Sequence, residues 1–142
     1  MITLRGHVAS RFGVAAPNLA TVEALILART GLHRMAPGTL NVVLPDRYLV
    51  RADEVIHSAE YFTGEVLKLQ RCRALGRRMI TMRPDSHEFT GSSAANVLEL
   101  ISDLHLRRTF GLKDGDTLEV EVEGDEVWWG SPEAPVPEAP SV

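Results

Sequence analysis

Residues 112–125 read Leu-Lys-Asp-Gly-Asp-Thr-Leu-Glu-Val-Glu-Val-Glu-Gly-Asp, and this stretch decides the class of fold. Between a turn at 113–116 and a second turn at 123–125, apolar and polar residues alternate strictly over 117–122. Alternation is the period of a β-strand with one buried face. Asp-Gly and Gly-Asp pairs are typical of tight turns between strands. The stretch therefore predicts a turn, a half-buried strand and a hairpin-like turn.

The same pattern recurs along the chain and predicts further strands. They cover residues 2–10, 39–44, 47–54 with a polar turn, 65–75, 78–82, 97–101 and 127–129. Gly76 joins the fourth and fifth of these segments. Residues 83–95 are polar and are predicted to form a long loop or a flexible lid.

Helices are few in this sequence. Residues 18–29 carry apolar side chains at helical spacing, with Asn18 as a plausible N-cap and Gly31 as a plausible stop. A single helical turn is expected at 105–110. Many short strands with regular turns and one main helix predict a mainly β fold, a small closed barrel of about six strands.

Two units are expected along the chain. Residues 1–129 form the barrel domain, and the 142 residues in all fit a single domain. Residues 130–142 are rich in Pro and Glu, and we expect them to be a disordered tail that packs against nothing and is dispensable.

Composition excludes several classes of function. The net charge of −4 argues against a nucleic-acid partner, which would need a basic surface. No apolar run is long enough to span a membrane, and the first residues do not resemble a signal peptide, so the cytoplasm is the expected location. The single cysteine, Cys72, cannot form an internal disulfide. The oligomeric state is not predicted.

Three segments carry a family resemblance. They are Pro37-Gly38-Thr39-Leu40-Asn41-Val42, then Leu98-Glu99-Leu100-Ile101, and finally Leu106-Arg107-Arg108-Thr109-Phe110 with the turn at 112–116. In order and spacing they resemble the CTP-dependent, archaeal-type riboflavin kinases. The resemblance spans roughly residues 4–125 and implies a cradle-loop barrel, of the riboflavin-kinase-like type. It also implies transfer of the terminal phosphate of CTP to the 5′-hydroxyl of riboflavin, which gives FMN and CDP.

Thr39 and Asn41 are the candidate metal ligands. They are two positions apart on a predicted strand, so both side chains point to one face. Neutral oxygens suit magnesium, which keeps several waters and bridges substrate phosphates. The resemblance gives both residues this role, with magnesium as the cofactor. The alternative is that they form the polar outer face of an ordinary strand.

Glu99 and Thr90 are the candidate contacts to riboflavin. Glu99 interrupts an apolar run, and a buried carboxylate is costly unless it is paired or neutralised. The resemblance implies that Glu99 binds the ribityl chain, and Glu99 is also the candidate catalytic base. Thr90 lies near a flavin-binding threonine of the family. The alternatives are a Glu99 that faces solvent on an edge strand and a mobile loop around Thr90.

The candidate nucleotide-binding residues fall in two segments. The resemblance assigns CTP to Leu104, His105, Leu106 and Arg107 in one segment, and to Arg11, Phe12 and Gly13 in the other. Arg107 would bind a phosphate through its planar fork. The family has a glycine-rich loop after its first strand, whereas here only Gly13 matches it. The alternative for the first segment is a surface turn with a solvated Arg107.

Three functions stay open at this point. The leading hypothesis is a CTP-dependent riboflavin kinase. The second is a non-catalytic relative that binds a flavin or a nucleotide, which the altered glycine loop motivates. The third is a barrel used for contact with another protein, with the tail as a linker.

Overall fold

The computed structural model describes residues 1–10, 19–61 and 65–138. Its elements in chain order are β1 (Ile2–Ala9), α1 (Leu19–Thr30), β2 (Leu40–Val43), β3 (Glu54–Ile56), α2 (Ser58–Tyr61), β4 (Leu67–Ala74), β5 (Arg77–Pro84), the 3-10 helix η1 (Asp85–Glu88), β6 (Val97–Ile101), α3 (Leu106–Phe110), β7 (Thr117–Val122) and α4 (Glu126–Trp129). Among these described residues, no helix is both long and apolar enough to cross a membrane.

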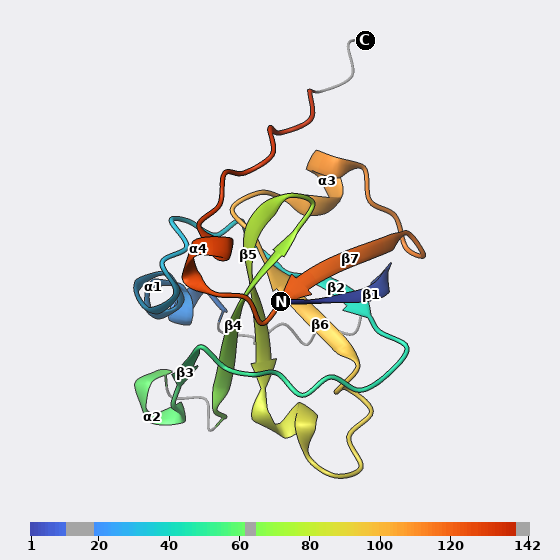
Figure 1. Ribbon diagram of the computed structural model, residues 1–142. Coiled ribbons are helices and arrows are strands. Elements are labelled where there is room, and N and C mark those ends of the chain that lie inside the picture. The colour runs from blue at the N-terminus through green and yellow to red at the C-terminus, as the bar shows by residue number, and fades with distance from the viewer. Residues whose placement is uncertain (11–18, 62–64, 139–142) are drawn as a thin grey trace.

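Six antiparallel strands close into a barrel (Figure 1). Their order is β4-β5-β6-β2-β1-β7, and β7 returns to β4 through the pairs Cys72↔Val122 and Arg73↔Glu121. β3 pairs with the other end of β4 and adds a strand outside the closed ring. The prediction of a mainly β, closed barrel of about six strands is therefore confirmed.

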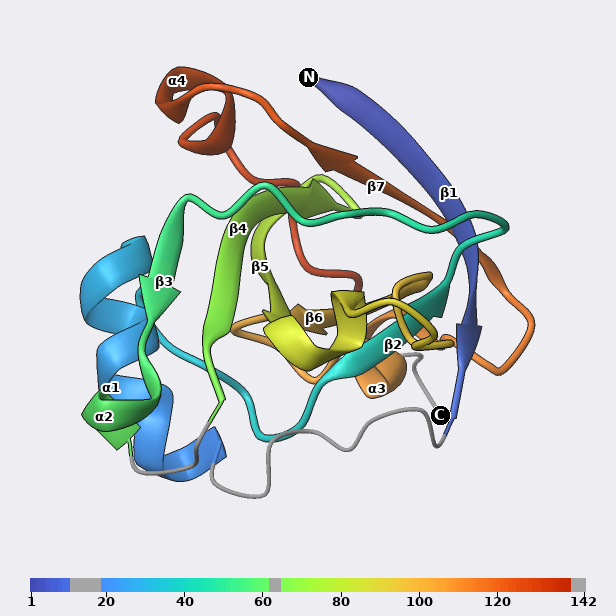
Figure 2. The same ribbon diagram turned by 90° about the horizontal axis from the view of Figure 1, so that it is seen from below.

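Apolar side chains fill both the interior of the barrel and the space under α1. The interior cluster takes residues from all six strands, including Val8, Leu40, Val42, Leu98, Val120 and Val122. A second cluster packs Val22 and Ile26 of α1 against the outer face of β4, β5 and β6. Figure 2 shows α1 beside β3 and β4 on this outer side. Because successive strand residues point to opposite faces, even-numbered positions of β2 and β6 point inward and odd-numbered positions point outward.

The main helix forms where the sequence predicts it. α1 ends at Thr30, and the next residue, Gly31, adopts a φ of 83° while its N–H donates to the carbonyl of Leu27 at 3.1 Å. Glycine suits this left-handed C-terminal cap because it has no Cβ to clash. The proposed N-cap, Asn18, lies outside the described residues.

Two predicted strands differ from the structure. Residues 126–129 form a helix, because Asp125 accepts a hydrogen bond from the N–H of Trp128 at 2.8 Å and caps its N-terminus. Trp129 is thereby turned inward, and its indole N–H donates to the carbonyls of Cys72 and Met79. The strand expected over 47–54 does not form, because the backbone N–H groups of Tyr48 and Val50 are bonded to Ala95 and Glu88 instead. β3 begins only at Glu54, the last residue of the expected strand.

Residues 131–134, which we call the C-terminal strap, lie against the β4–β5 hairpin. The buried Arg73 guanidinium donates to the carbonyls of Ser131 and Pro132, and Arg77 donates to that of Ala134. The N–H of Ala134 donates to the carbonyl of Gly76 at 2.9 Å. The expectation that nothing packs against this part of the tail is wrong, because its partners are strand arginines distant in sequence. The sequence expectation for residues 139–142 lies outside the described residues.

The strap contacts reverse the expectation that the tail is dispensable. Ending the chain after Gly130 should lower the melting temperature by about 10 °C, because buried arginines lose charge-assisted hydrogen bonds worth about 3 kcal/mol in total. A chain that ends after Val136 keeps every strap contact and serves as the control. Calorimetry of the two truncations checks this, and equal melting temperatures would contradict it.

Candidate functional site

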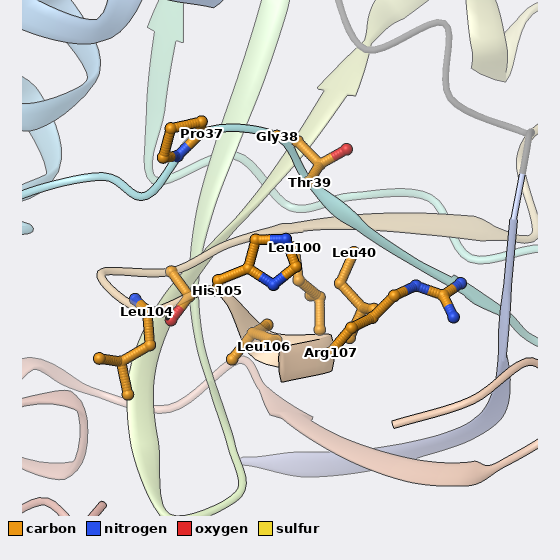
Figure 3. A pocket seen from close by; sticks show the side chains of 10 residues that line it. Pro37, Gly38, Thr39, Leu40, Leu100, Leu104, His105, Leu106 and Arg107 are labelled. Carbon is orange, nitrogen blue, oxygen red and sulfur yellow. Dashed lines mark hydrogen bonds between the residues drawn. The ribbon is translucent and has the colours of Figure 1, made fainter. Parts of the chain in front are cut away.

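A pocket of about 100 Å³ lies between the start of β2 and the start of α3 (Figure 3). We call it the β2–α3 pocket. One wall is residues 37–40, and the other is Leu100, Ser102 and residues 104–107. The fold thus brings Thr39 to the same pocket as Leu104, His105, Leu106 and Arg107, which are 65 or more positions away in the sequence (104 − 39 = 65).

Local structure orients the side chains around this pocket. Leu40 and Leu106 are buried and point into the barrel core. His105 is the N-cap of α3 and accepts a hydrogen bond on Nδ1 from the N–H of Arg108 at 3.3 Å. Figure 3 shows the His105 ring between the two walls, whereas the Thr39 hydroxyl points away from α3. The pocket therefore presents His105 and backbone from both walls, with the Thr39 hydroxyl on the outer side of β2.

Arg107 is held in a defined position. Its Nη2 donates to Asp114 Oδ1 at 2.6 Å and to Ser10 Oγ at 3.2 Å. The alternative of a merely solvated Arg107 is wrong, since the guanidinium is paired. Ser10 is also the last described residue before the segment with Arg11, Phe12 and Gly13, which lies outside the described residues. Arg107 thus lies where the chain enters the predicted nucleotide loop.

Asn41 and Glu99 are directly opposite each other on β2 and β6. Both are nearly buried, with 8% and 3% of their surface exposed. Within the described part of the chain, Asn41 Oδ1 and both carboxylate oxygens of Glu99 lack a hydrogen-bond partner. β6 lies between β2 and β5, so the alternative of a solvent-facing Glu99 on an edge strand is wrong. Buried oxygen atoms without partners are costly, which is typical of positions that bind a ligand.

Glu99 also lines a second pocket, of about 450 Å³, which we call the Glu99 pocket. Its other lining residues are Val43, His87, Ser93, Ala94, Asn96 and Val97. Burial raises the pKa of Glu99 from 4.5 to about 7, and the nearby positive charge of Arg83 opposes this rise. A carboxyl group with this pKa can take up a proton near neutral pH.

Arg83 fixes the surroundings of Glu99. It is completely buried on β5 and donates to the carbonyls of Tyr48 and Val97 and to Glu88 Oε2. Burial lowers the pKa of His87, and the charge of Arg83 lowers it further, which favours a neutral imidazole beside Glu99. Arg83 does not line the Glu99 pocket itself, but its bonds to Tyr48, Glu88 and Val97 hold it near Glu99 from three separate segments of the chain.

The residues present fit a magnesium ion on the outer side of β2. Thr39 and Asn41 are two positions apart on that side, and Asn41 Oδ1 is a buried acceptor that the described protein does not satisfy. Two neutral oxygens leave most coordination positions to water and phosphate, as magnesium prefers. Among the described residues no three His, Cys, Asp or Glu side chains cluster as metal ligands.

Several residues of the site escaped the sequence analysis. His87, Ser93 and Asn96 line the Glu99 pocket, but they fall in a polar stretch that reads as a loop. Arg83 could have been noticed as a charge at the end of an apolar segment. Thr90, by contrast, is exposed and is not among the residues that line either of the two pockets described above.

Comparison with known proteins identifies the family of this domain. The family model of the CTP-dependent riboflavin kinase domain, described as domain of unknown function DUF120, matches residues 31–122. The chain belongs to this family. The matched stretch runs from the end of α1 to the end of β7. It therefore contains every residue that lines the β2–α3 pocket and the Glu99 pocket.

Two relatives of the domain are named riboflavin kinase. The protein of Methanocella arvoryzae is 35% identical over 92 residues, which are 61% of this chain and 41% of that protein. The protein of Staphylothermus marinus is 26% identical over 129 residues, which are 88% of this chain and 95% of that protein. The chain therefore spans less than half the length of the first relative and nearly all of the second.

Proposed function

We propose that this domain transfers the terminal phosphate of CTP to the 5′-hydroxyl of riboflavin and forms FMN and CDP. One observation carries the proposal. Asn41 and Glu99, with buried oxygens that lack partners, face each other midway along the β2–β6 pair. The β2–α3 pocket lies at one end of that pair, and the Glu99 pocket lies at the other. Two ligands bound at the two ends would meet at these oxygens.

The two pockets suit different parts of the substrates. In the β2–α3 pocket, backbone groups of residues 104–107 would bind the cytosine, and Arg107 would contact a phosphate by exchanging part of its bonding with Asp114. In the larger Glu99 pocket, Glu99 would contact the ribityl chain of riboflavin. His87 and Asn96 there can serve as further hydrogen-bonding groups.

The proposed reaction needs positioning and one proton acceptor. The riboflavin 5′-oxygen forms a bond to the terminal phosphorus of CTP while the bond from that phosphorus to CDP breaks. The hydroxyl proton passes to the Glu99 carboxylate, whose pKa of about 7 leaves a substantial ionised fraction at neutral pH. Thr39 and Asn41 would hold magnesium, which, when bound, supplies positive charge to the transferred phosphate.

The donor preference tests this function. With riboflavin and magnesium present, we expect CTP to support FMN formation at least about tenfold faster than ATP, because a pocket of this size selects the smaller base. Parallel assays at equal nucleotide concentration, with separation of FMN from riboflavin, measure the ratio. Equal rates or faster transfer from ATP would contradict the proposed donor.

A second candidate function follows from the altered loop. Gly13 is the only glycine in residues 11–16, and Arg107 is already paired with Asp114. Both features favour a relative that binds riboflavin or CTP without transferring phosphate. Binding of both substrates with no FMN formed under the conditions above would select this second function.

A further inference from the structure

Ser102 connects the two walls of the β2–α3 pocket. Its carbonyl accepts the N–H of Ala36 at 2.8 Å, and Ala36 directly precedes the wall at 37–40. Its hydroxyl oxygen accepts the N–H of Leu104 at 3.1 Å, and Leu104 begins the opposite wall. Ser102 is only 3% exposed, so these bonds are shielded from water. The spacing of the walls therefore depends on where Ser102 is held.

Asp103 holds Ser102 from behind the pocket. Asp103 is 5% exposed and is not among the residues that line the pocket. Its Oδ2 accepts from Arg77 Nη2 at 3.0 Å and lies 3.2 Å from His33 Nε2, while its Oδ1 accepts from the Ser102 hydroxyl at 3.4 Å. A buried ion pair of this kind adds little net stability compared with apolar residues of the same volume. The contact of Asp103 with Ser102 indicates instead that the ion pair holds Ser102 in position.

Arg77 is fixed in turn by the C-terminal strap. It belongs to β5 and is 8% exposed. Its Nη1 donates to the carbonyl of Ala134 at 3.0 Å, and its Nη2 lies 3.7 Å from Glu133 Oε2. A continuous series of contacts thus runs from the strap through Arg77 and Asp103 to Ser102. Of these, only Ser102 is among the residues that line the pocket.

We propose that Asp103 and Arg77 are positioning residues that set the spacing of the β2–α3 pocket, and that the C-terminal strap holds Arg77 for this purpose. The inference rests on the proposed function, in that the pocket takes a cytidine nucleotide. Its prediction is specific: disturbing the pair weakens nucleotide binding more than it slows the transfer step. A purely structural pair would instead change only the free energy of unfolding.

The test measures the Kd of CDP by calorimetry without riboflavin, together with KM for CTP, kcat and the melting temperature. Asp103→Asn keeps the size of the side chain and removes its charge. We expect its Kd and KM to rise at least about tenfold while kcat changes by less than about threefold. Arg77→Lys, which keeps the charge, should bind CDP with an affinity between those of the wild type and Arg77→Met.

Arg78→Gln is the matched control. Arg78 neighbours Arg77 and lies 3.4 Å from Glu133 of the strap, but it has no contact with Asp103 among the interactions described. Its Kd for CDP should equal that of the wild type. A loss of affinity in Arg78→Gln as large as that in Asp103→Asn would attribute the effect to general stability and overturn the inference.

The remaining outcomes separate this inference from the proposed function. An unchanged Kd in folded Asp103→Asn overturns the positioning role alone. If that variant does not fold, Ser102→Ala removes only the hydroxyl that links Asp103 to Leu104, and an unchanged Kd there also overturns the role. Failure of the wild-type protein to bind CDP at all would overturn the proposed function, and the inference with it.

Discussion

Replacing Thr39 by Val or Asn41 by Leu is expected to slow FMN formation by about a hundredfold or more while the barrel stays folded. Asn41 lies on the outer side of β2, and the Thr39 hydroxyl, one residue before the strand, points away from α3 (Figure 3). Neither residue belongs to the core cluster that contains Leu40 and Val42. Loss of one magnesium ligand removes stabilisation of the developing charge, which can amount to several kcal/mol. High magnesium concentrations should restore part of the rate, since the site is weakened rather than abolished.

The melting temperature decides between this role and a structural one. Asn41 Oδ1 has no partner among the described residues, so Asn41→Leu should leave the melting temperature unchanged or raise it. Thr3→Val, on the exposed face of β1, is the matched control for Thr39→Val. The measurements are FMN formation across a magnesium titration and thermal unfolding. Near-normal turnover in both variants would exclude these residues from the site, and loss of activity together with the fold would favour the polar-face alternative.

Glu99→Gln is expected to lose about a hundredfold or more in transfer rate and to gain stability at alkaline pH. Burial raises the pKa of Glu99 to about 7, above its ordinary value of 4.5. The stability that its protonated form contributes is therefore complete below pH 4.5 and is lost as the pH rises to about 7. Glutamine does not titrate, so the variant escapes the cost of a buried charge, which is about 3 kcal/mol.

Urea unfolding at pH 5 and at pH 8 measures this difference. The advantage of Glu99→Gln over the wild type should be small at pH 5 and should reach its full size at pH 8. Glu119→Gln, at an exposed position of β7, is the matched control and should show no such dependence on pH. An equal stability difference at both pH values would show that Glu99 titrates normally, and it would also remove the physical basis for its role as proton acceptor.

The strands could be predicted because their pattern is local. Leu118, Val120 and Val122 alternate with polar residues, and the structure buries all three in the barrel interior. Glu99 was recognisable for the opposite reason, as a carboxylate inside an apolar run. The sequence alone could not place Asn41 opposite Glu99, because the register between β2 and β6 depends on the whole sheet.

The buried arginines show why other features escaped prediction. Arg73, Arg77 and Arg83 are charged residues that a pattern assigns to solvent, yet each is buried because backbone carbonyls or carboxylates from distant segments reach it. The strap could not be predicted for the same reason. Its composition is typical of a disordered tail, and its partners are arginines that are distant in the sequence. A strand was expected at residues 127–129, which include two adjacent tryptophans. The side chain of Asp125 instead caps the N-terminus of α4 by accepting the N–H of Trp128, which stabilises a helix.

The pairing of β1 with β7 imposes an order on the folding of this chain. The two strands are matched at six consecutive positions, from Ile2↔Val122 to His7↔Thr117, and the nearby Ser10–Asp114 bond joins residues 104 positions apart. Closing so long a loop is entropically costly, and chains with such distant contacts fold slowly. During synthesis, β1 leaves the ribosome before β7, so the edge of β1 that pairs with β7 stays unpaired until β7 has emerged. The Arg107–Asp114 contact is local, because the two residues are seven positions apart, whereas the Arg107–Ser10 contact forms only when β1 has paired with β7. The Arg107 side of the β2–α3 pocket is therefore completed only at this step.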